Sequence, residues 1–381
     1  MLKDYLDNKP IFYDEIDYSR FPNIYDKIKT NFNQLKNIHI IGTNGKGTTG
    51  RFLASALNSL GFKVGHYTSP HILKFNERVW LNGSNVSDVK LEEAHLKLQT
   101  ILTKEDSESL SYFEYTTLLA QLIFSKCDYV VLEAGLGGEY DASAVFPKIL
   151  TLLTPVDIDH EFFLGSTIKE IATTKLNAVQ NNLIVGYQNY DEVMQIANDL
   201  VTKKDIVLKT INELLDEKDM QNIKFISKDL KLASYLEQNL SLSISALKFL
   251  GIDYSVEDFK DARLFGRLTP YKSNIILDVG HNILASSSIL EALNKKKYVL
   301  IYNSYKDKNY KEILNILKPI IVRVEIINVD DDRIELKSKL QKTIKDIGLK
   351  CKDFKTCNDD EDYLVFGSFS VVEAFLKEVQ S

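Results

Sequence analysis

The fold of this chain follows from one stretch, Ile38-His-Ile-Ile-Gly-Thr-Asn-Gly-Lys-Gly-Thr-Thr-Gly50. Its first residues are apolar and carry no charge, which predicts a buried strand. The strand breaks into a glycine-rich turn over 42–47, and a helical pattern of apolar residues then runs to Gly61. A strand, a glycine turn and a helix N-terminus aim backbone N–H groups at a phosphate. The stretch therefore predicts a phosphate-binding loop.

The side chains of this loop have the chemistry that such a site needs. Gly45 and Gly47 let the main chain approach a ligand closely, and Lys46 supplies a point charge. The hydroxyl of Thr48 or Thr49 can reach a metal ion. The strict Walker A spacing is not met, because Gly47 separates the lysine from the threonines. An ordinary turn remains the alternative from this stretch alone.

Length and composition set the class of protein. A chain of 381 residues is long enough for two domains, and 44% hydrophobic with 26% charged residues is typical of a soluble globular protein. The net charge of −6 argues against nucleic-acid binding. Three scattered cysteines (Cys127, Cys351 and Cys357) argue against a disulfide framework or a zinc site. The charged first residues and the lack of a membrane-length apolar run predict a cytoplasmic protein without a membrane partner.

Strands alternate with helices along most of the chain, which predicts an α/β fold with mostly parallel sheets. We expect a P-loop-type ATPase domain over residues 1–261 and a smaller Rossmann-like α/β domain over 262–381. The linker is expected at 260–268. Residues 75–83 predict a small hairpin, and the charged stretch 202–230 is interpreted as irregular or as a small antiparallel excursion.

Several polar residues lie where parallel strands end, which is where such sheets bind ligands. Glu133 closes an apolar strand and is followed by a glycine cluster. A carboxylate there suits Mg²⁺, which prefers carboxylate and hydroxyl oxygens. His160 is also expected at a strand end, and Asp278-Val-Gly-His-Asn282 ends the first strand of the second domain. Solvated strand ends and helix caps are the alternatives.

Four further positions have both a functional and a structural interpretation. Arg267 lies in the expected linker, where a guanidinium can bridge two domains onto a phosphate; a surface arginine is the alternative. Lys175 is expected to be an ordinary solvated helix lysine. Asn239 presents an amide on an apolar helix face and needs a hydrogen-bond partner. The Tyr112–Tyr115 cluster predicts core packing at a helix start.

Taken in order, these segments resemble the folylpolyglutamate synthase/dihydrofolate synthase branch of the Mur ligase superfamily. The resemblance spans roughly residue 36 to the C-terminus. Its pieces are Gly42-Thr-Asn-Gly-Lys-Gly-Thr48, Tyr67-Thr-Ser-Pro-His71, Phe75-Asn-Glu-Arg-Val79, Tyr112-Phe-Glu-Tyr115, Leu132-Glu-Ala-Gly-Leu-Gly-Gly138, Asp159-His160 with Leu164-Gly165, Gly266-Arg-Leu268, Asp278-Val-Gly-His-Asn282 and Phe366-Gly-Ser368.

The resemblance implies an ATP-dependent ligase that joins L-glutamate to dihydropteroate or folate through an acyl phosphate. It implies an ATP-binding domain of the Mur ligase central type, followed by a glutamate-ligase domain. It also implies Mg²⁺, with two ions expected and room for a monovalent cation. The resemblance implies that the ATP phosphates are bound by Thr43, Asn44, Gly45, Lys46, Gly47 and Thr48, that adenine is bound by Asn239, and that the ATP site is completed by Arg267, Asp278 and His281. It implies one Mg²⁺ on Thr48, Ser69 and Glu133, a second on His160, and Lys175 as a carbamylated residue of the metal site. The pterin is expected to contact Phe113 and Asp141.

The chain departs from the family pattern at three places. Glu139 replaces an arginine, Ser143-Ala144 replaces Thr-Asn, and Thr174-Lys-Leu-Asn177 replaces Glu-Lys-Ala-Gly. A monomer that both makes dihydrofolate and extends polyglutamate tails is the preferred interpretation. One alternative is another Mur-type ligase that adds amino acids to a cell-wall precursor. The other is a nucleotide-binding regulator without ligase activity.

Overall fold

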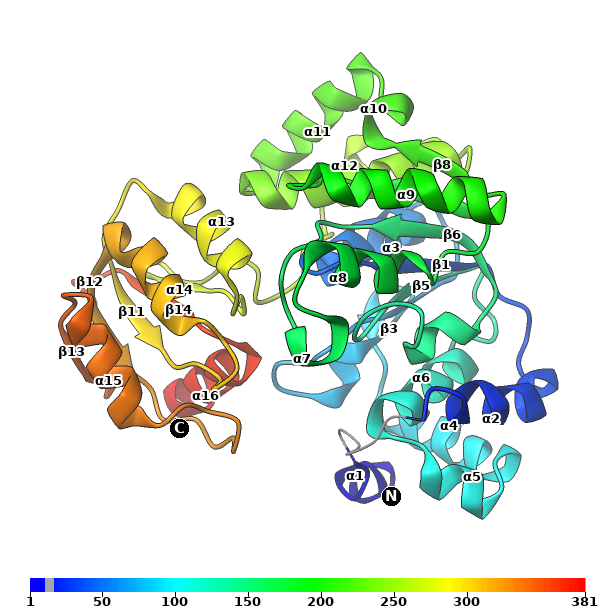
Figure 1. Ribbon diagram of the computed structural model, residues 1–381, viewed down its shortest axis with the longest axis horizontal. Helices are drawn as coiled ribbons and strands as arrows, with labels where there is room; N and C mark the ends of the chain where they lie inside the picture. The colour runs from blue at the N-terminus through cyan, green and yellow to red at the C-terminus, as the bar shows by residue number, and fades with distance from the viewer. Residues whose placement is uncertain (11–16, 381) are drawn as a thin grey trace. The chain divides into compact units, whose positions relative to one another are not determined.

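Two β-sheets, each covered by helices, make up the structure (Figure 1). The computed structural model of the protein describes residues 1–10 and 17–380. They fall into two units that divide between Arg263 and Leu264, and residues 233–235 belong with the second unit. This architecture confirms the predicted α/β fold with a large, mostly parallel sheet and a second, smaller sheet.

The sheet of the first unit has eight strands in the order β4-β3-β2-β5-β1-β6-β7-β8. Strands β2, β5, β1, β6, β7 and β8 are parallel, and only the β3–β4 edge is antiparallel. The strands are β1 (Asn37–Ile41), β2 (Val64–Tyr67), β3 (Val79–Leu81), β4 (Ser84–Asn85), β5 (Tyr129–Glu133), β6 (Lys148–Leu153), β7 (Asn182–Val185) and β8 (Val207–Thr210).

Helices pack on both faces of this sheet. They are α1 (Leu2–Asp7), α2 (Arg20–Ile28), α3 (Lys46–Ser59), α4 (Asp88–Ile101), α5 (Lys104–Ser109), α6 (Tyr112–Ile123), α7 (Glu161–Leu164), α8 (Ile168–Leu176), α9 (Asp191–Lys204), α10 (Ile211–Leu214), α11 (Glu217–Asp229) and α12 (Ser234–Phe249). Ile38 and Ile40 of β1 share a core with α3, α11 and α12. On the opposite face, Val130 and Leu132 of β5 share a core with α1, α2, α4 and α6, while α8 and α9 cover β6 and β7.

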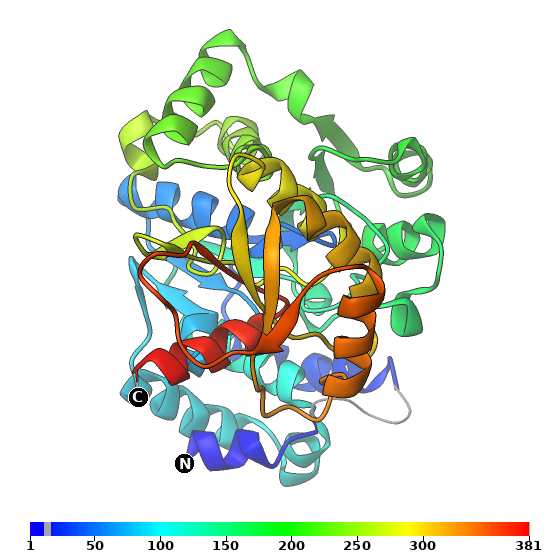
Figure 2. The same ribbon diagram turned by 90° about the vertical axis from the view of Figure 1, so that its left-hand side faces the viewer.

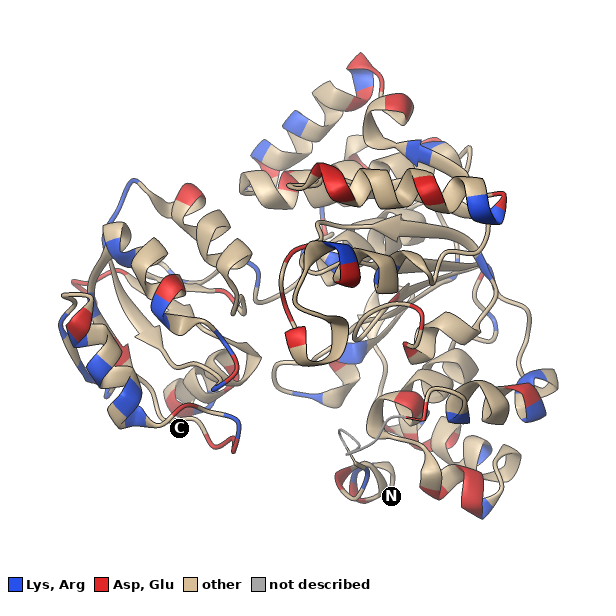
Figure 3. Ribbon diagram, in the orientation of Figure 1, with Lys and Arg blue, Asp and Glu red and all other residues tan. Residues whose placement is uncertain are grey.

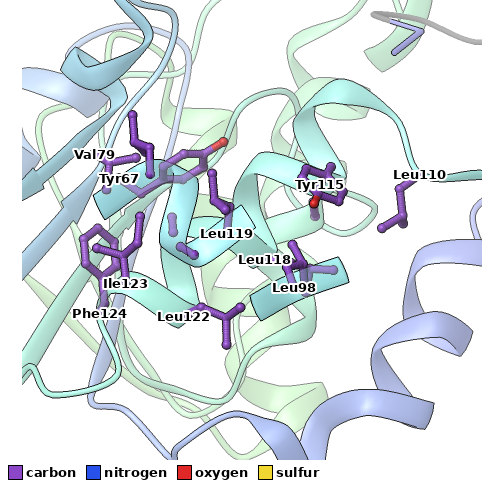
Figure 4. Close-up of a cluster of buried hydrophobic side chains, with 14 of the residues drawn as sticks. Tyr67, Val79, Leu98, Leu110, Tyr115, Leu118, Leu119, Leu122, Ile123 and Phe124 are labelled. Carbon is purple, nitrogen blue, oxygen red and sulfur yellow. The ribbon is translucent and has the colours of Figure 1, made fainter. Parts of the chain in front are cut away.

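Alternate strand residues belong to opposite cores because successive strand side chains point to opposite faces. Figure 4 shows part of the core around α6, where Tyr67 of β2 and Phe124 lie among leucines of α4 and α6. Helix α6 begins with a capping box, in which Ser111 and Glu114 each accept a hydrogen bond from the other's backbone N–H. This fixes where α6 starts, with Phe113 in its first turn.

The second unit has a six-stranded sheet in the order β13-β12-β11-β14-β10-β9, parallel except for the β9 edge. Its elements are β9 (Thr269–Lys272), β10 (Ile275–Leu277), α13 (Ile283–Leu293), β11 (Tyr298–Tyr302), α14 (Tyr310–Leu317), β12 (Ile321–Ile326), α15 (Lys337–Asp346), β13 (Cys351–Asp353), β14 (Tyr363–Phe366) and α16 (Phe369–Gln380). Figure 2 shows α15 and α16 on opposite sides of these strands.

The prediction for residues 202–230 is wrong. Strand β8 joins β7 in parallel, and most of the remaining stretch forms α11. Most charged residues of α11 are exposed, whereas Asp219, Ile223 and Ile226 are buried. Both acidic and basic residues lie along this helix (Figure 3).

Two smaller predictions also need correction. The hairpin is confined to β3 and β4, because Phe75–Arg78 forms a 3₁₀ turn. The Glu77 carboxylate holds that turn by accepting hydrogen bonds from three successive backbone N–H groups, those of residues 72–74. His160 does not end a strand: β6 stops at Leu153, and His160 lies in the following loop, directly before α7. Among the described residues, none of the helices combines the length and the apolar character needed to cross a bilayer.

Candidate active site

The loop between β1 and α3 is held in a conformation that requires glycine. Gly42 and Gly45 have φ angles of 139° and 88°, in the region that side chains rarely adopt. A Cβ on Gly42 would lie 2.0 Å from Oγ1 of Thr154. The N–H and hydroxyl of Thr43 bond to the carbonyls of Pro155 and Asp157, which anchors the loop to the segment after β6. The first turn of α3 therefore begins beside the carboxyl ends of three parallel strands.

Two lysines converge on this loop. Lys46 Nζ donates to the carbonyl oxygens of Gly42 and Thr43 at 3.2 and 3.1 Å. Lys175 Nζ donates to the Gly42 carbonyl at 2.9 Å. Lys175 is only 4% exposed, so its expected solvated state is wrong. Burial, with a smaller contribution from the charge of Lys46, lowers the pKa of Lys175 to about 7.

Hard oxygen donors lie next to the loop. The hydroxyl of Thr48 is buried and has no hydrogen-bond partner among the described residues. Glu133 ends β5, is paired with Ile40 of β1 and is 5% exposed. Its carboxylate accepts hydrogen bonds from the Thr68 hydroxyl and the Ser69 backbone N–H. A buried carboxylate and a partnerless hydroxyl suit Mg²⁺.

In the described part of the chain, no three His, Cys, Asp or Glu side chains gather closely enough to hold a metal. A cation at Thr48 and Glu133 would therefore take its other ligands from phosphate oxygens and water, as protein-bound Mg²⁺ commonly does.

A small pocket opens over the two lysines. It is lined by Gly42, Thr43, Lys46, Gly135, Leu136, Gly137, Asp159, His160 and Lys175. His160 has a positive φ of 54° and directly precedes α7. The pocket thus joins the phosphate loop, the glycine cluster after β5 and the loop after β6. Two lysines and three glycines line it together with one carboxylate, that of Asp159, so the lysines can bind an anion beside an acidic group.

Asp141 holds the backbone at Leu136, one of the residues that line this pocket. Its buried carboxylate accepts hydrogen bonds from the backbone N–H groups of Leu136 and Ser143, both at 2.9 Å, and from the Ser143 hydroxyl. Burial raises the pKa of Asp141, and these hydrogen bonds oppose the rise. His39 of β1 contacts the same Ser143 hydroxyl at 2.7 Å through Nε2. Sequence reasoning missed this role of His39 and Ser143, because nothing in the motif order links β1 to the loop after β5.

Two other candidates of the first unit lie against glycines of the site. A Cβ added to Gly45 would come within 2.4 Å of the Asn239 side-chain oxygen, so Asn239 of α12 abuts the phosphate loop. The Phe113 ring occupies the equivalent space at Gly135. The structure thus brings Asn239 and Phe113 to the two glycine segments, from helices on opposite faces of the sheet.

The remaining candidates lie together in the second unit. Asp278 follows β10 and accepts hydrogen bonds from the backbone N–H groups of Leu268 and Gly280 and from the Tyr235 hydroxyl. Burial raises the pKa of Asp278, and the nearby charge of Arg267 opposes the rise. The Arg267 guanidinium lies 5.1 Å from the centre of the Phe369 ring. His281 lies in the same turn, with Nδ1 3.2 Å from the carbonyl oxygen of Val279.

No protein-family model matches the chain. A protein of Buchnera aphidicola subsp. Acyrthosiphon pisum named dihydrofolate synthase/folylpolyglutamate synthase is 30% identical, and the alignment covers 88% of each chain. The crystal structure of Helicobacter pylori folylpolyglutamate synthetase superposes with a TM-score of 0.81 at 37% identity, over 100% of this chain and 98% of that one. This chain belongs to the dihydrofolate synthase/folylpolyglutamate synthase family.

Membership of this family confirms the resemblance seen in the motifs and makes the protein an ATP-dependent ligase. Family membership does not favour the alternative interpretation, a Mur-type ligase that adds amino acids to a cell-wall precursor. A bifunctional folylpolyglutamate synthase/dihydrofolate synthase from Yersinia pestis, solved as a complex with AMPPNP and a Mn ion, has the same fold with a TM-score of 0.82 at 20% identity. The superposition covers 100% of this chain and 97% of the Yersinia pestis protein.

Proposed function

We propose that this family member both joins L-glutamate to dihydropteroate and extends folates by further glutamates, using ATP in each case. The observation that carries the proposal is the convergence of Lys46 and Lys175 on the Gly42 carbonyl, beside the partnerless hydroxyl of Thr48. The Lys46 ammonium places a positive charge at this neutral carbonyl, beside the backbone of the loop. An anion of high charge, such as a triphosphate, would compensate it.

The ATP phosphates are assigned to residues 43–48, with Lys46 on the β/γ oxygens. The backbone N–H groups at the start of α3 support this assignment, because they point toward the loop without intrahelical partners. Asn239 is assigned to the adenine. Its position against Gly45 supports a contact with the nucleotide.

Two Mg²⁺ ions are proposed, the first on Thr48, Ser69 and Glu133 and the second on His160, and a monovalent cation also fits this scheme. When bound, such ions neutralise phosphate charge and orient the transferred group. Lys175 is proposed to be carbamylated and to serve the second ion. Its lowered pKa supports this, because only the neutral amine reacts with carbon dioxide.

Each domain has its own role in the proposed reaction. Residues 1–261 form the ATP-binding domain, and residues 262–381 form the glutamate-ligase domain, whose Arg267, Asp278 and His281 also act on ATP. The pterin is assigned to Phe113 and Asp141. The contact of Phe113 with Gly135 supports its part, and Asp141 contributes by fixing the loop beside it.

The chemistry follows from the weakness of a carboxylate as an electrophile. Lys46 holds the γ-phosphate so that the acceptor carboxylate attacks it in line, which forms an acyl phosphate and ADP. The glutamate amine then attacks the acyl carbon, and phosphate leaves. Water must be kept from the acyl phosphate during this step, because it would hydrolyse the intermediate.

A substrate panel tests the proposal. ADP release is measured with ATP, glutamate and one acceptor, either dihydropteroate, tetrahydrofolate or a muramyl peptide. We expect release with the first two acceptors and none with the third. Release that needs no glutamate would support a nucleotide-driven regulator instead. Sedimentation and cell fractionation would test the monomeric state and cytoplasmic location, which stay predictions.

A further inference from the structure

Arg78 lies in a segment that none of the site assignments uses. It ends the 3₁₀ turn before β3, and its backbone carbonyl accepts a hydrogen bond from the Thr68 N–H at 2.9 Å. Thr68 in turn donates its hydroxyl to Glu133. The backbone of Arg78 is therefore linked through Thr68 to Glu133, a proposed ligand of the first metal ion.

The guanidinium of Arg78 is held in a fixed orientation. Its Nε donates a 2.8 Å hydrogen bond to Nδ1 of His71, and its central carbon lies 5.1 Å from the centre of the Tyr112 ring. Stacking on an aromatic ring and one bond through Nε leave the two terminal nitrogens for another partner. All three side chains are half-buried.

Within residues 1–10 and 17–380, no carboxylate forms an ion pair with the Arg78 guanidinium. Its positive charge therefore has no counter-ion in the part of the chain that the structure describes. The adjacent Glu77 carboxylate is already committed to the backbone N–H groups of residues 72–74. A planar guanidinium that is oriented but unpaired is suited to a carboxylate ligand, which it can bind through two parallel hydrogen bonds.

The two acceptors differ in the carboxylates that they present. Dihydropteroate has a single carboxylate, and it is consumed in the reaction. A folate ends in glutamate, which carries one carboxylate that reacts and one that does not. We propose that Arg78, positioned by His71 and Tyr112, binds the unreacting carboxylate of a glutamylated acceptor and so serves polyglutamate extension rather than dihydrofolate synthesis.

This inference rests on the proposed bifunctional reaction, and kinetics of Arg78→Met with both acceptors test it. We expect kcat/KM for tetrahydrofolate to fall by about 10- to 100-fold, the usual effect of losing a charged hydrogen bond. With dihydropteroate, kcat/KM and the KM for glutamate should stay within about 3-fold of wild type. Lys74→Met, which removes a charge from the same loop, is the matched control and should not separate the two acceptors.

A second substrate makes the test independent of folding. Wild type should discriminate between tetrahydrofolate and an analogue whose unreacting carboxylate is a carboxamide, and Arg78→Met should lose that discrimination. An equal loss with both acceptors, a raised KM for glutamate, or unchanged discrimination would overturn the inference. Failure of wild type to release ADP with either acceptor would instead refute the proposed function.

Discussion

Lys175 in α8 donates a hydrogen bond to the carbonyl oxygen of Gly42, 133 residues earlier in the chain. Lys46 reaches the same oxygen from the first turn of α3. Because α3 and α8 pack on opposite faces of the sheet, their lysines meet only at its carboxyl edge. This meeting places the side chain proposed to bind the triphosphate, that of Lys46, beside the one proposed to serve the second metal ion, that of Lys175.

Lys46→Ala should lower kcat for ADP release by at least about 100-fold, because it removes a preorganised donor to the transferred phosphate. The fold should remain, since Lys46 contacts only loop carbonyls. Lys97→Ala, at an exposed position of α4, is the control for loss of charge. Near-normal turnover of the variant would remove Lys46 from the phosphate site.

Glu133→Gln should raise the Mg²⁺ concentration needed for half-maximal rate by about 10-fold or more, because a neutral amide is a poor ligand for this ion. The measurement is a Mg²⁺ titration of initial rate at saturating ATP. Glu93→Gln, on the exposed face of α4, should titrate like wild type. An unchanged titration in Glu133→Gln would take this residue out of the metal shell.

Thr48→Val and Thr49→Val form a matched pair, because both hydroxyls are buried and lack a partner among the described residues. Replacing a partnerless hydroxyl by a methyl group should leave the free energy of unfolding unchanged or raise it by about 1 kcal/mol in both variants. Only Thr48→Val should lose Mg²⁺-dependent activity. Equal activity in the two variants would contradict a metal role for Thr48.

The lowered pKa of Lys175 predicts a pH-dependent stability. Between about 7 and the ordinary lysine value of 10.5, the folded protein binds fewer protons than the unfolded chain at this side chain. The free energy of unfolding of wild type should therefore rise with pH across this window, relative to Lys175→Met. From pH 7 to pH 9 the relative gain should be about 2 kcal/mol, from a limit of about 1.4 kcal/mol per pH unit.

Urea unfolding of wild type and Lys175→Met in buffers free of carbon dioxide measures this difference. Below pH 7 the two curves should run parallel, because the ammonium is then charged in both the folded and the unfolded state. Parallel curves at all pH values would mean that Lys175 is not buried as an amine.

The sequence by itself determined the elements of this protein that depend on local pattern. Apolar runs predicted β1, β5 and β6, the first two with glycine turns after them, and the motif order predicted the family. Charged stretches were harder to interpret. In an amphipathic helix such as α11, the many charged residues of the solvent face obscure the spacing of the few buried residues. Short edge strands such as β13 were missed because their pairing depends on a neighbouring strand rather than on their own residues.

Only the tertiary structure decided the state of the side chains. Sequence assigned Lys175 to a solvated helix face, yet packing of α8 against the sheet buries its amine at the Gly42 carbonyl. Likewise, the sequence pattern could not connect Asp141 with His39, or Arg78 with Tyr112. Desolvation and hydrogen bonding depend on which atoms are brought together in space, and residues far apart in the chain supply those atoms.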